Sequence, residues 1–245
     1  AIEAGYRHID TSPTYGNQRA IGCGLCRAFD RGLCCREDLF ITTKLPDYGM
    51  NAEHVPHYLY KSLQDLRLKY VDLYLINFPA GSFFDPATNH QAPDFSTCHA
   101  RIWQAMEDQV YAGHACAIGL CNFNRRQVDN ILGTARIPPA NLQLEMNVYC
   151  QQKEMLEYCK NRNITLSAYA PLGSPAFATA IVNPPGSRRK KLQPMIDPTV
   201  AEVARKHAVG PALVLLRYLL QLGVAVLPKS ADYGRVRLNA KVRLD

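Results

Sequence analysis

The amino-acid sequence predicts an α/β protein whose fold class is a (β/α)8 TIM barrel. Three observations predict it. Short apolar segments of strand character alternate with amphipathic segments of helical spacing along the whole chain. The segment 71–78 is apolar almost throughout, as expected of a strand that helices cover on both faces. The chain has 245 residues, close to the roughly 250 of a typical barrel, and the number of strands favours a barrel over a doubly wound sheet.

The expected elements follow one another in regular order. The expected strands are 7–10, 39–45, 71–78, 115–121, 141–147, 164–170 and 224–227. The expected helices are 17–29, 52–66, 97–112, 125–132, 151–161, 199–207 and 211–222, and a further helix begins within 233–241. Two stretches, 81–95 and 174–197, are expected to be long loops. Because both follow strands, we expect both on the active-site face of the barrel.

The charge balance indicates which partners to expect. The net charge is +7, partly because of the basic run 188–191. This run is not interleaved with aromatic residues and no nucleic-acid recognition motif accompanies it, so we expect no nucleic-acid partner. No apolar run reaches the roughly 20 residues that span a bilayer, so we expect no membrane partner. The positive charge also suits a cofactor that carries phosphate groups.

The cysteines predict neither a metal site nor a disulfide framework. There are nine of them, an odd number in a long chain. Cys23 and Cys26 are spaced like half of a zinc site, but they lie on an expected helix and no matching second pair follows. We therefore interpret all nine as reduced thiols of a cytoplasmic protein.

Candidate catalytic residues stand at the ends of the first two expected strands. Asp10 ends the first strand, Tyr15 lies in the loop after it, and Lys44 lies at the end of the second strand. The carboxyl ends of parallel strands build the active site in this fold class. A tyrosine is a poor acid unless a cation lies nearby, and Lys44 can be that cation. The alternative is structural, with Asp10 capping the next helix, Tyr15 packed on the surface and Lys44 an exposed strand end.

The stretch 5–22, which includes Gly5-Tyr6-Arg7-His8-Ile9-Asp10 and Tyr15-Gly16-Asn17-Gln18, resembles the aldo-keto reductase family, NADPH-dependent carbonyl reductases on a (β/α)8 barrel. The resemblance implies that Tyr15 is the proton donor and that Lys44 and Asp10 tune it. It also makes Asn77 a catalytic position, where the family has a histidine that orients the carbonyl group. Asn147 is a second departure, at a position where relatives often have histidine.

The resemblance also implies the residues that bind NADP(H). The nicotinamide carboxamide would be bound by Cys121, Asn122 and Gln143, and the nicotinamide ring would stack on Tyr169. The pyrophosphate would be reached by Leu172 and Ser174. The 2′-phosphate and adenine site would consist of Lys229, Ser230, Arg235 and Asn239. Cations and a hydroxyl group are the donors that a phosphate needs.

The resemblance implies one NADP-dependent oxidoreductase domain over residues 1–245. The first expected strand of this chain, 7–10, matches the second strand of the family's barrel, so we expect a barrel that is incomplete at both termini. The expected function is reduction of a small carbonyl substrate by a cytoplasmic monomer. One alternative, suggested by Asn77, Asn147 and the short ends, is a catalytically weak NADPH-binding protein. Another is a phosphate-binding barrel lyase or isomerase, which would need an acid–base pair elsewhere.

Overall fold

The computed structural model describes residues 1–85, 90–94, 96–174 and 193–242. The backbone divides into two compact units, one of residues 2–142 and one of residues 143–245 together with Ala1. The division falls inside a strand, β7 (Asn141–Glu145), which begins in the first unit and ends in the second.

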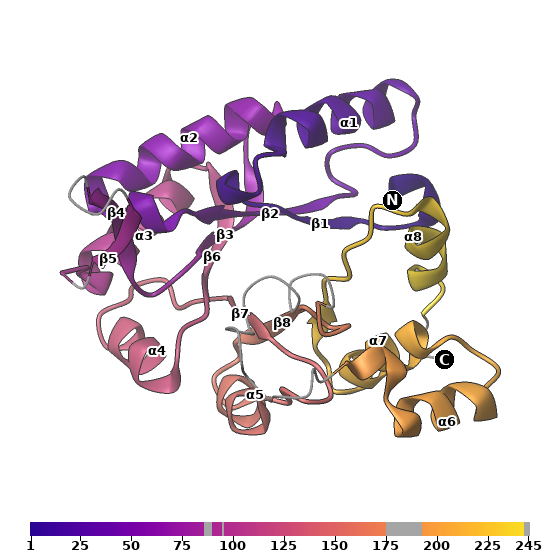
Figure 1. The fold of residues 1–245 in the computed structure, drawn as a ribbon. Helices are drawn as coiled ribbons and strands as arrows, with labels where there is room; N and C mark the ends of the chain where they lie inside the picture. The colour runs from indigo at the N-terminus through magenta and orange to yellow at the C-terminus, as the bar shows by residue number, and fades with distance from the viewer. Residues whose placement is uncertain (86–89, 95, 175–192, 243–245) are drawn as a thin grey trace. The chain divides into compact units, whose positions relative to one another are not determined.

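The first unit is a parallel sheet with helices between its strands (Figure 1). The strands, in spatial order, are β1 (His8–Asp10), β2 (Phe40–Leu45), β3 (Val71–Ile76) and β6 (Ala115–Cys121). The helices are α1 (Gln18–Asp30), α2 (Val55–Leu66), α3 (His99–Tyr111) and α4 (Arg125–Leu132), with short 3-10 turns η1 (Ile2–Ala4), η2 (Pro13–Tyr15), η3 (Asp47–Gly49) and η4 (Ala52–His54). Figure 1 shows α1 and α2 side by side along β1 and β2.

The packing of this unit follows from its sequence pattern. The side chains of Leu73, Tyr74 and Leu75 on β3 are all buried, although they alternate between the two faces of the sheet. This burial on both faces is what the apolar run of the sequence predicts. Helices α1 and α2 approach closely at Gly22, where a Cβ atom would lie only 2.4 Å from the carbonyl oxygen of Asp65. A side chain at residue 22 would therefore push the two helices apart.

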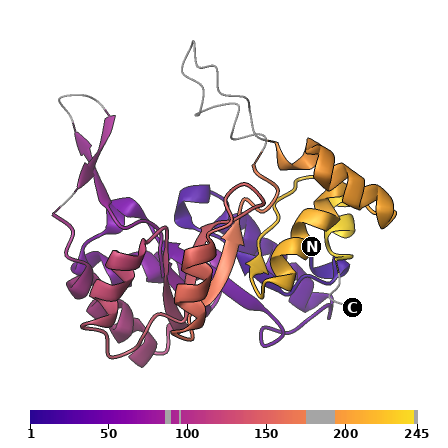
Figure 2. The same ribbon diagram turned by 90° about the horizontal axis from the view of Figure 1, so that it is seen from below.

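The prediction that residues 81–95 form a loop is wrong. An antiparallel hairpin is formed by β4 (Gly81–Asp85) and β5 (His90–Asp94), with Gly81 opposite Asp94. Figure 2 shows this hairpin projecting away from the parallel sheet of its unit. Side-chain contacts hold its base, because Ser82 Oγ donates to Asp47 Oδ2 at 2.7 Å and Gly81 N donates to Thr97 Oγ1 at 3.1 Å. Neither contact has a periodic signature in the sequence.

The second unit continues the alternation of strands and helices. Its elements are β8 (Thr165–Tyr169) and β9 (Ala225–Val226), with α5 (Lys153–Lys160), η5 (Pro194–Ile196), α6 (Pro198–Lys206), α7 (Pro211–Gln221) and α8 (Tyr233–Asn239). Strand β8 lies between β7 and β9 and pairs in parallel with β9. Most of the other expected loop, 174–197, lies outside the described residues.

The expected order of strands and helices is confirmed, with differences of a few residues at the ends. All nine cysteines are free thiols. Within the described residues, no cluster of three or more His, Cys, Asp or Glu side chains could hold a metal ion. In that same part of the chain, no helix has the length and apolar character needed to cross a membrane.

Candidate active site

The first unit brings three predicted catalytic residues together around the side chain of Lys44. This side chain is 1% exposed. Its Nζ lies 2.5 Å from Asp10 Oδ1, 3.1 Å from Tyr15 Oη and 3.4 Å from the carbonyl oxygen of Thr11. The ammonium group therefore donates to a carboxylate and to a phenol in one partly buried cluster.

The register of the sheet explains why Lys44 meets Asp10. Asp10 pairs with Thr42 across β1 and β2, and Lys44 follows Thr42 by two residues. Side chains two residues apart on a strand point to the same face. The long side chain of Lys44 can therefore reach Asp10 from the neighbouring strand.

The turn η2 places Tyr15. Ser12 is its N-cap and accepts a hydrogen bond from Thr14 N, Pro13 opens it, and Gly16 closes it in the left-handed conformation with φ 65°. The Tyr15 side chain is 53% exposed, yet its hydroxyl group is bound by Lys44. Two parts of the structural alternative are therefore wrong, because Ser12 and not Asp10 caps the turn, and Lys44 is buried rather than exposed.

The charge state of Lys44 follows from its neighbours. Burial disfavours the ammonium form, but the negative charge of Asp10, the phenol of Tyr15 and their hydrogen bonds outweigh burial. The net effect raises the pKa of Lys44. The side chain is therefore positively charged at neutral pH, and its charge is directed at the Tyr15 oxygen.

Asn77 directly follows β3 and is held through its backbone. Its N–H donates to the carbonyl oxygen of Leu45 at 3.1 Å, and its own carbonyl oxygen accepts from Asn122 Nδ2 at 3.1 Å. Within the described part of the chain, no hydrogen bond is made by the side-chain amide of Asn77. The next residue, Phe78, is 50% exposed. The amide is thus available to donate one neutral hydrogen bond.

Cys121 ends β6, and Asn122 follows it beside Asn77. Burial raises the pKa of the Cys121 thiol to about 12, with a smaller lowering by Lys44 and a smaller raising by Asp10. Cys121 is therefore a neutral thiol at physiological pH. Asn122 has the left-handed φ of 65°, and its Nδ2 also lies 3.3 Å from Cys121 Sγ. Asn tolerates this conformation better than most residues.

The other predicted cofactor residues belong to the second unit. Gln143 is buried in β7, Tyr169 is half-buried at the end of β8, and the turn that follows contains Leu172 and Ser174. The remaining ones follow β9: Lys229 is exposed, Ser230 is half-buried, Arg235 is exposed in the first turn of α8, and Asn239 is buried in its last turn.

The 229–235 segment is ordered by its own side chains. Ser230 Oγ accepts from Asp232 N at 3.1 Å, and Asp232 Oδ1 caps α8 by accepting from Arg235 N at 2.8 Å. Among the described residues, no acidic side chain forms an ion pair with Lys229 or Arg235. Both cations therefore keep their charge exposed, which suits an anionic ligand.

Sequence reasoning missed several residues that support the first-unit cluster. Thr11 contributes only a backbone carbonyl oxygen, which leaves no signal in the sequence. Gln18 Nε2 donates to Thr43 Oγ1 at 2.8 Å and links α1 to β2 beside Lys44. His99 contacts the segment after β3, and only the tertiary structure reveals this contact.

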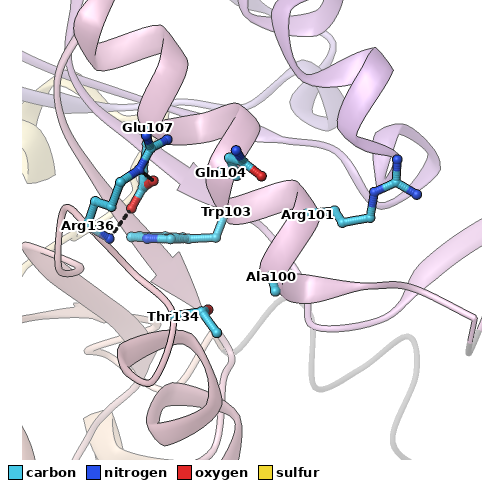
Figure 3. A pocket seen from close by; sticks show the side chains of 7 residues that line it. All are labelled: Ala100, Arg101, Trp103, Gln104, Glu107, Thr134 and Arg136. Atoms are coloured by element: carbon cyan, nitrogen blue, oxygen red, sulfur yellow. Dashed lines mark hydrogen bonds and ion pairs between the residues drawn. The ribbon is translucent and has the colours of Figure 1, made fainter.

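A cavity of about 360 Å³ lies along α3, and it includes none of the predicted site residues (Figure 3). It is lined by Ala100, Arg101, Trp103, Gln104, Glu107, Thr134 and Arg136. Glu107 is 2% exposed, and its Oε1 accepts from the backbone N–H groups of Arg136 at 2.6 Å and Ile137 at 2.9 Å. Trp103 Nε1 donates to the Ile137 carbonyl oxygen at 3.0 Å. The residues that line the cavity therefore have a structural role, because their hydrogen bonds connect the segment before β7 to α3.

The parallel α/β fold and the charged cluster at its strand ends define a barrel enzyme. Comparisons with known proteins identify the protein family. The Aldo/keto reductase family model matches residues 1–244. The chain is 37% identical to Aldo-keto reductase family 4 member C11 of Arabidopsis thaliana, over 99% of this chain and 74% of that protein. It is 38% identical to Aldo-keto reductase family 1 member A1 of Bos taurus, over 99% of this chain and 74% of the relative.

A solved structure gives the same answer. The aldose reductase of Schistosoma japonicum is similar to this chain with a TM-score of 0.87 and 37% identity, covering 98% of this chain and 75% of that one. The chain belongs to the aldo/keto reductase family. This membership confirms the predicted barrel class and supports an oxidoreductase that acts on small carbonyl compounds with a nicotinamide cofactor.

Proposed function

We propose that this protein is an NADPH-dependent reductase of aldehydes and ketones in which Tyr15 donates the proton. The observation that carries the proposal is the position of Lys44 Nζ, 2.5 Å from Asp10 Oδ1 and 3.1 Å from Tyr15 Oη. A phenol that must release a proton needs a neighbouring cation, and that cation needs a partner when it is buried. The three residues together meet both requirements.

The proposed chemistry is a proton transfer to oxygen. The nicotinamide cofactor, when bound, supplies the hydride that reduces the carbonyl carbon. Tyr15 gives its hydroxyl proton to the carbonyl oxygen as negative charge develops there. Lys44 stabilises the phenolate that remains, and Asp10 holds the ammonium group in place. Asn77 offers its amide N–H to the same carbonyl oxygen and so orients the substrate.

The chemistry of the donor set fits a phosphorylated dinucleotide. The exposed cations Lys229 and Arg235, which form no ion pair with a described residue, suit the 2′-phosphate together with the hydroxyl group of Ser230, and Asn239 suits the adenine end. In our proposal, the carboxamide is bound by Cys121, Asn122 and Gln143. The ring of Tyr169 stacks on the nicotinamide, and the pyrophosphate is bound at Leu172 and Ser174.

NADPH is expected to bind at least about tenfold more tightly than NADH, because one charge-assisted hydrogen bond is worth roughly 1.5–3 kcal/mol. Arg235→Ala should weaken NADPH binding by about tenfold and leave NADH binding nearly unchanged. Fluorescence titration with each cofactor measures both constants. Arg237→Ala is the matched control, an exposed arginine on the same helix. Equal dissociation constants for the two cofactors in the wild type would remove the basis of the assignment.

Asn77→His is expected to raise kcat by about tenfold, because the imidazole restores the family's orienting group. One donor to a developing oxyanion is worth roughly 2.7–4 kcal/mol, and the Asn amide already supplies part of it. The affinity for NADPH should change little. The measurement is NADPH consumption with a reactive aldehyde such as a nitrobenzaldehyde. A folded, NADPH-binding variant without any gain would mean that Asn77 does not limit catalysis.

A second candidate function is a catalytically weak member of the family that holds NADPH without efficient turnover. The observation that favours it is Asn77 itself, since an amide donates only a neutral hydrogen bond and cannot titrate. The two functions differ in one assay. The reductase consumes NADPH when an aldehyde is added, whereas the weak binder gives only the fluorescence change of cofactor binding.

The setting of the reaction is also part of the proposal. We propose that the whole chain acts as one catalytic domain and as a monomer in the cytoplasm. The nine free thiols support a reducing compartment. Light scattering of the purified protein, with and without NADPH, measures the oligomeric state, and a dimeric mass would contradict this part.

A further inference from the structure

The proposed reaction does not use His99. This histidine contacts both of the segments that carry the amide side chains of Asn77 and Asn122. His99 is the first residue of α3, and its Nε2 lies 2.5 Å from the carbonyl oxygen of Pro79. Its ring packs against Phe123, with the ring centroids 5.1 Å apart and the planes inclined by 51°. Pro79 lies two residues after Asn77, and Phe123 directly follows Asn122. His99 therefore connects the ends of β3 and β6.

The direction of the hydrogen bond defines the state of the imidazole. A carbonyl oxygen can only accept, so His99 Nε2 must carry a proton. Both the neutral Nε2–H tautomer and the imidazolium ion meet this condition. The contact is thus a donation from the His99 ring to the Pro79 carbonyl oxygen.

The segment 77–79 is bound from two sides. The carbonyl oxygen of Asn77 accepts from Asn122 Nδ2 at 3.1 Å, while the carbonyl oxygen of Pro79 accepts from His99. The N–H of Asn77 is bound to the carbonyl oxygen of Leu45. These three contacts hold the peptide planes on both sides of Asn77 and the plane that follows Pro79. The backbone sets the Cα–Cβ direction of a side chain and restricts its rotamers, so these contacts limit the directions open to the Asn77 amide.

We infer that His99 is a positioning residue, which holds the segment 77–79 so that the Asn77 amide keeps one direction toward the substrate carbonyl. The inference rests on the proposed reductase function for its catalytic consequence. A hydrogen bond can hold the segment after a strand in place only if its donor lies on a rigid element. His99 meets this condition, because the side chains of Ile102 and Trp103, in the first two turns of α3, are buried.

A double-mutant cycle tests whether His99 acts through Asn77. His99→Phe keeps a ring against Phe123 but removes the donor to Pro79. In the wild-type background we expect kcat to fall by roughly threefold to tenfold, as for one lost hydrogen bond, with the NADPH dissociation constant nearly unchanged. In an Asn77→Ala background the same change should alter kcat by less than about twofold, because no amide remains to be positioned. An equal loss in both backgrounds would overturn the inference.

Hydrogen–deuterium exchange of the peptide covering 74–82 gives a readout that does not need activity. His99→Phe should accelerate exchange there, and unchanged exchange would overturn the inference. The matched control is His114→Phe, just after the other end of α3, where the imidazole Nδ1 contacts Gln109 Oε1 at 3.2 Å. It should alter neither kcat nor this exchange. If the wild type reduces no carbonyl compound, the proposed function fails, while the exchange measurement still decides whether His99 holds the segment.

Discussion

Tyr15→Phe is expected to lower the turnover of a reactive aldehyde by about a thousandfold while NADPH binding survives. A positioned general acid contributes typically 10²–10⁴-fold, and the substitution removes only the hydroxyl group that would give the proton. The ring and the turn η2 should remain, because the cap of Ser12 and the left-handed Gly16 do not depend on this hydroxyl group. The measurements are NADPH consumption under saturating aldehyde and fluorescence titration of the cofactor.

Tyr60→Phe is the control for this experiment. Tyr60 lies on α2, is 61% exposed, and loses the same hydroxyl group without any contact to Lys44. Its turnover should equal that of the wild type. Wild-type turnover in Tyr15→Phe would show that another group donates the proton, and the assignment built on Asp10, Tyr15 and Lys44 would then be wrong.

Glu107→Ala is expected to lower the free energy of unfolding by about 3 kcal/mol. The carboxylate is buried and accepts from the backbone N–H groups of Arg136 and Ile137, and its other oxygen lies 3.1 Å from Arg136 Nε. Without it, two partly buried donors lose their partner, at up to roughly 1–3 kcal/mol each. Partial relaxation of the segment toward solvent offsets some of this cost. Urea denaturation followed by circular dichroism measures the change.

Asp108→Ala is the matched control, because it removes the adjacent carboxylate in the same helix. Asp108 is 62% exposed and lies 3.8 Å from Arg136 Nη2, so it forms only a surface ion pair. Its loss should cost less than about 1 kcal/mol. Similar losses for the two variants would mean that the backbone contacts of Glu107 contribute nothing special to stability.

The elements that the sequence predicted well are those with a strong period. The alternation of strands and helices emerged because each strand of the parallel sheet is apolar and each helix shows one apolar stripe. The meeting of Asp10, Tyr15 and Lys44 was also accessible, because strand ends in this fold converge on one face. Residue roles in cofactor binding came from the family resemblance, and they remain predictions.

What the sequence did not predict depends on contacts between distant segments. The hairpin β4–β5 is too short to have a reliable period, and its base is held by Ser82 and Thr97, which contact residues 35 and 16 positions away. His99 looked like any polar residue at a helix start, since its partner is a backbone carbonyl oxygen. Glu107 gave no signal for a similar reason, because backbone N–H groups occur at nearly every residue.

The left-handed backbone at Asn122 restricts the residue types that this position accepts. At φ 65°, a β-branched or bulky side chain is strained, so glycine, asparagine and aspartate are the residues that the backbone favours. The side chain must also donate a hydrogen bond to the carbonyl oxygen of Asn77. Glycine has no side-chain donor and an ionised aspartate only accepts, so of these three residues only asparagine satisfies both demands. Two separate constraints therefore restrict substitution at residue 122: the left-handed backbone torsion and the hydrogen bond to the carbonyl oxygen of Asn77.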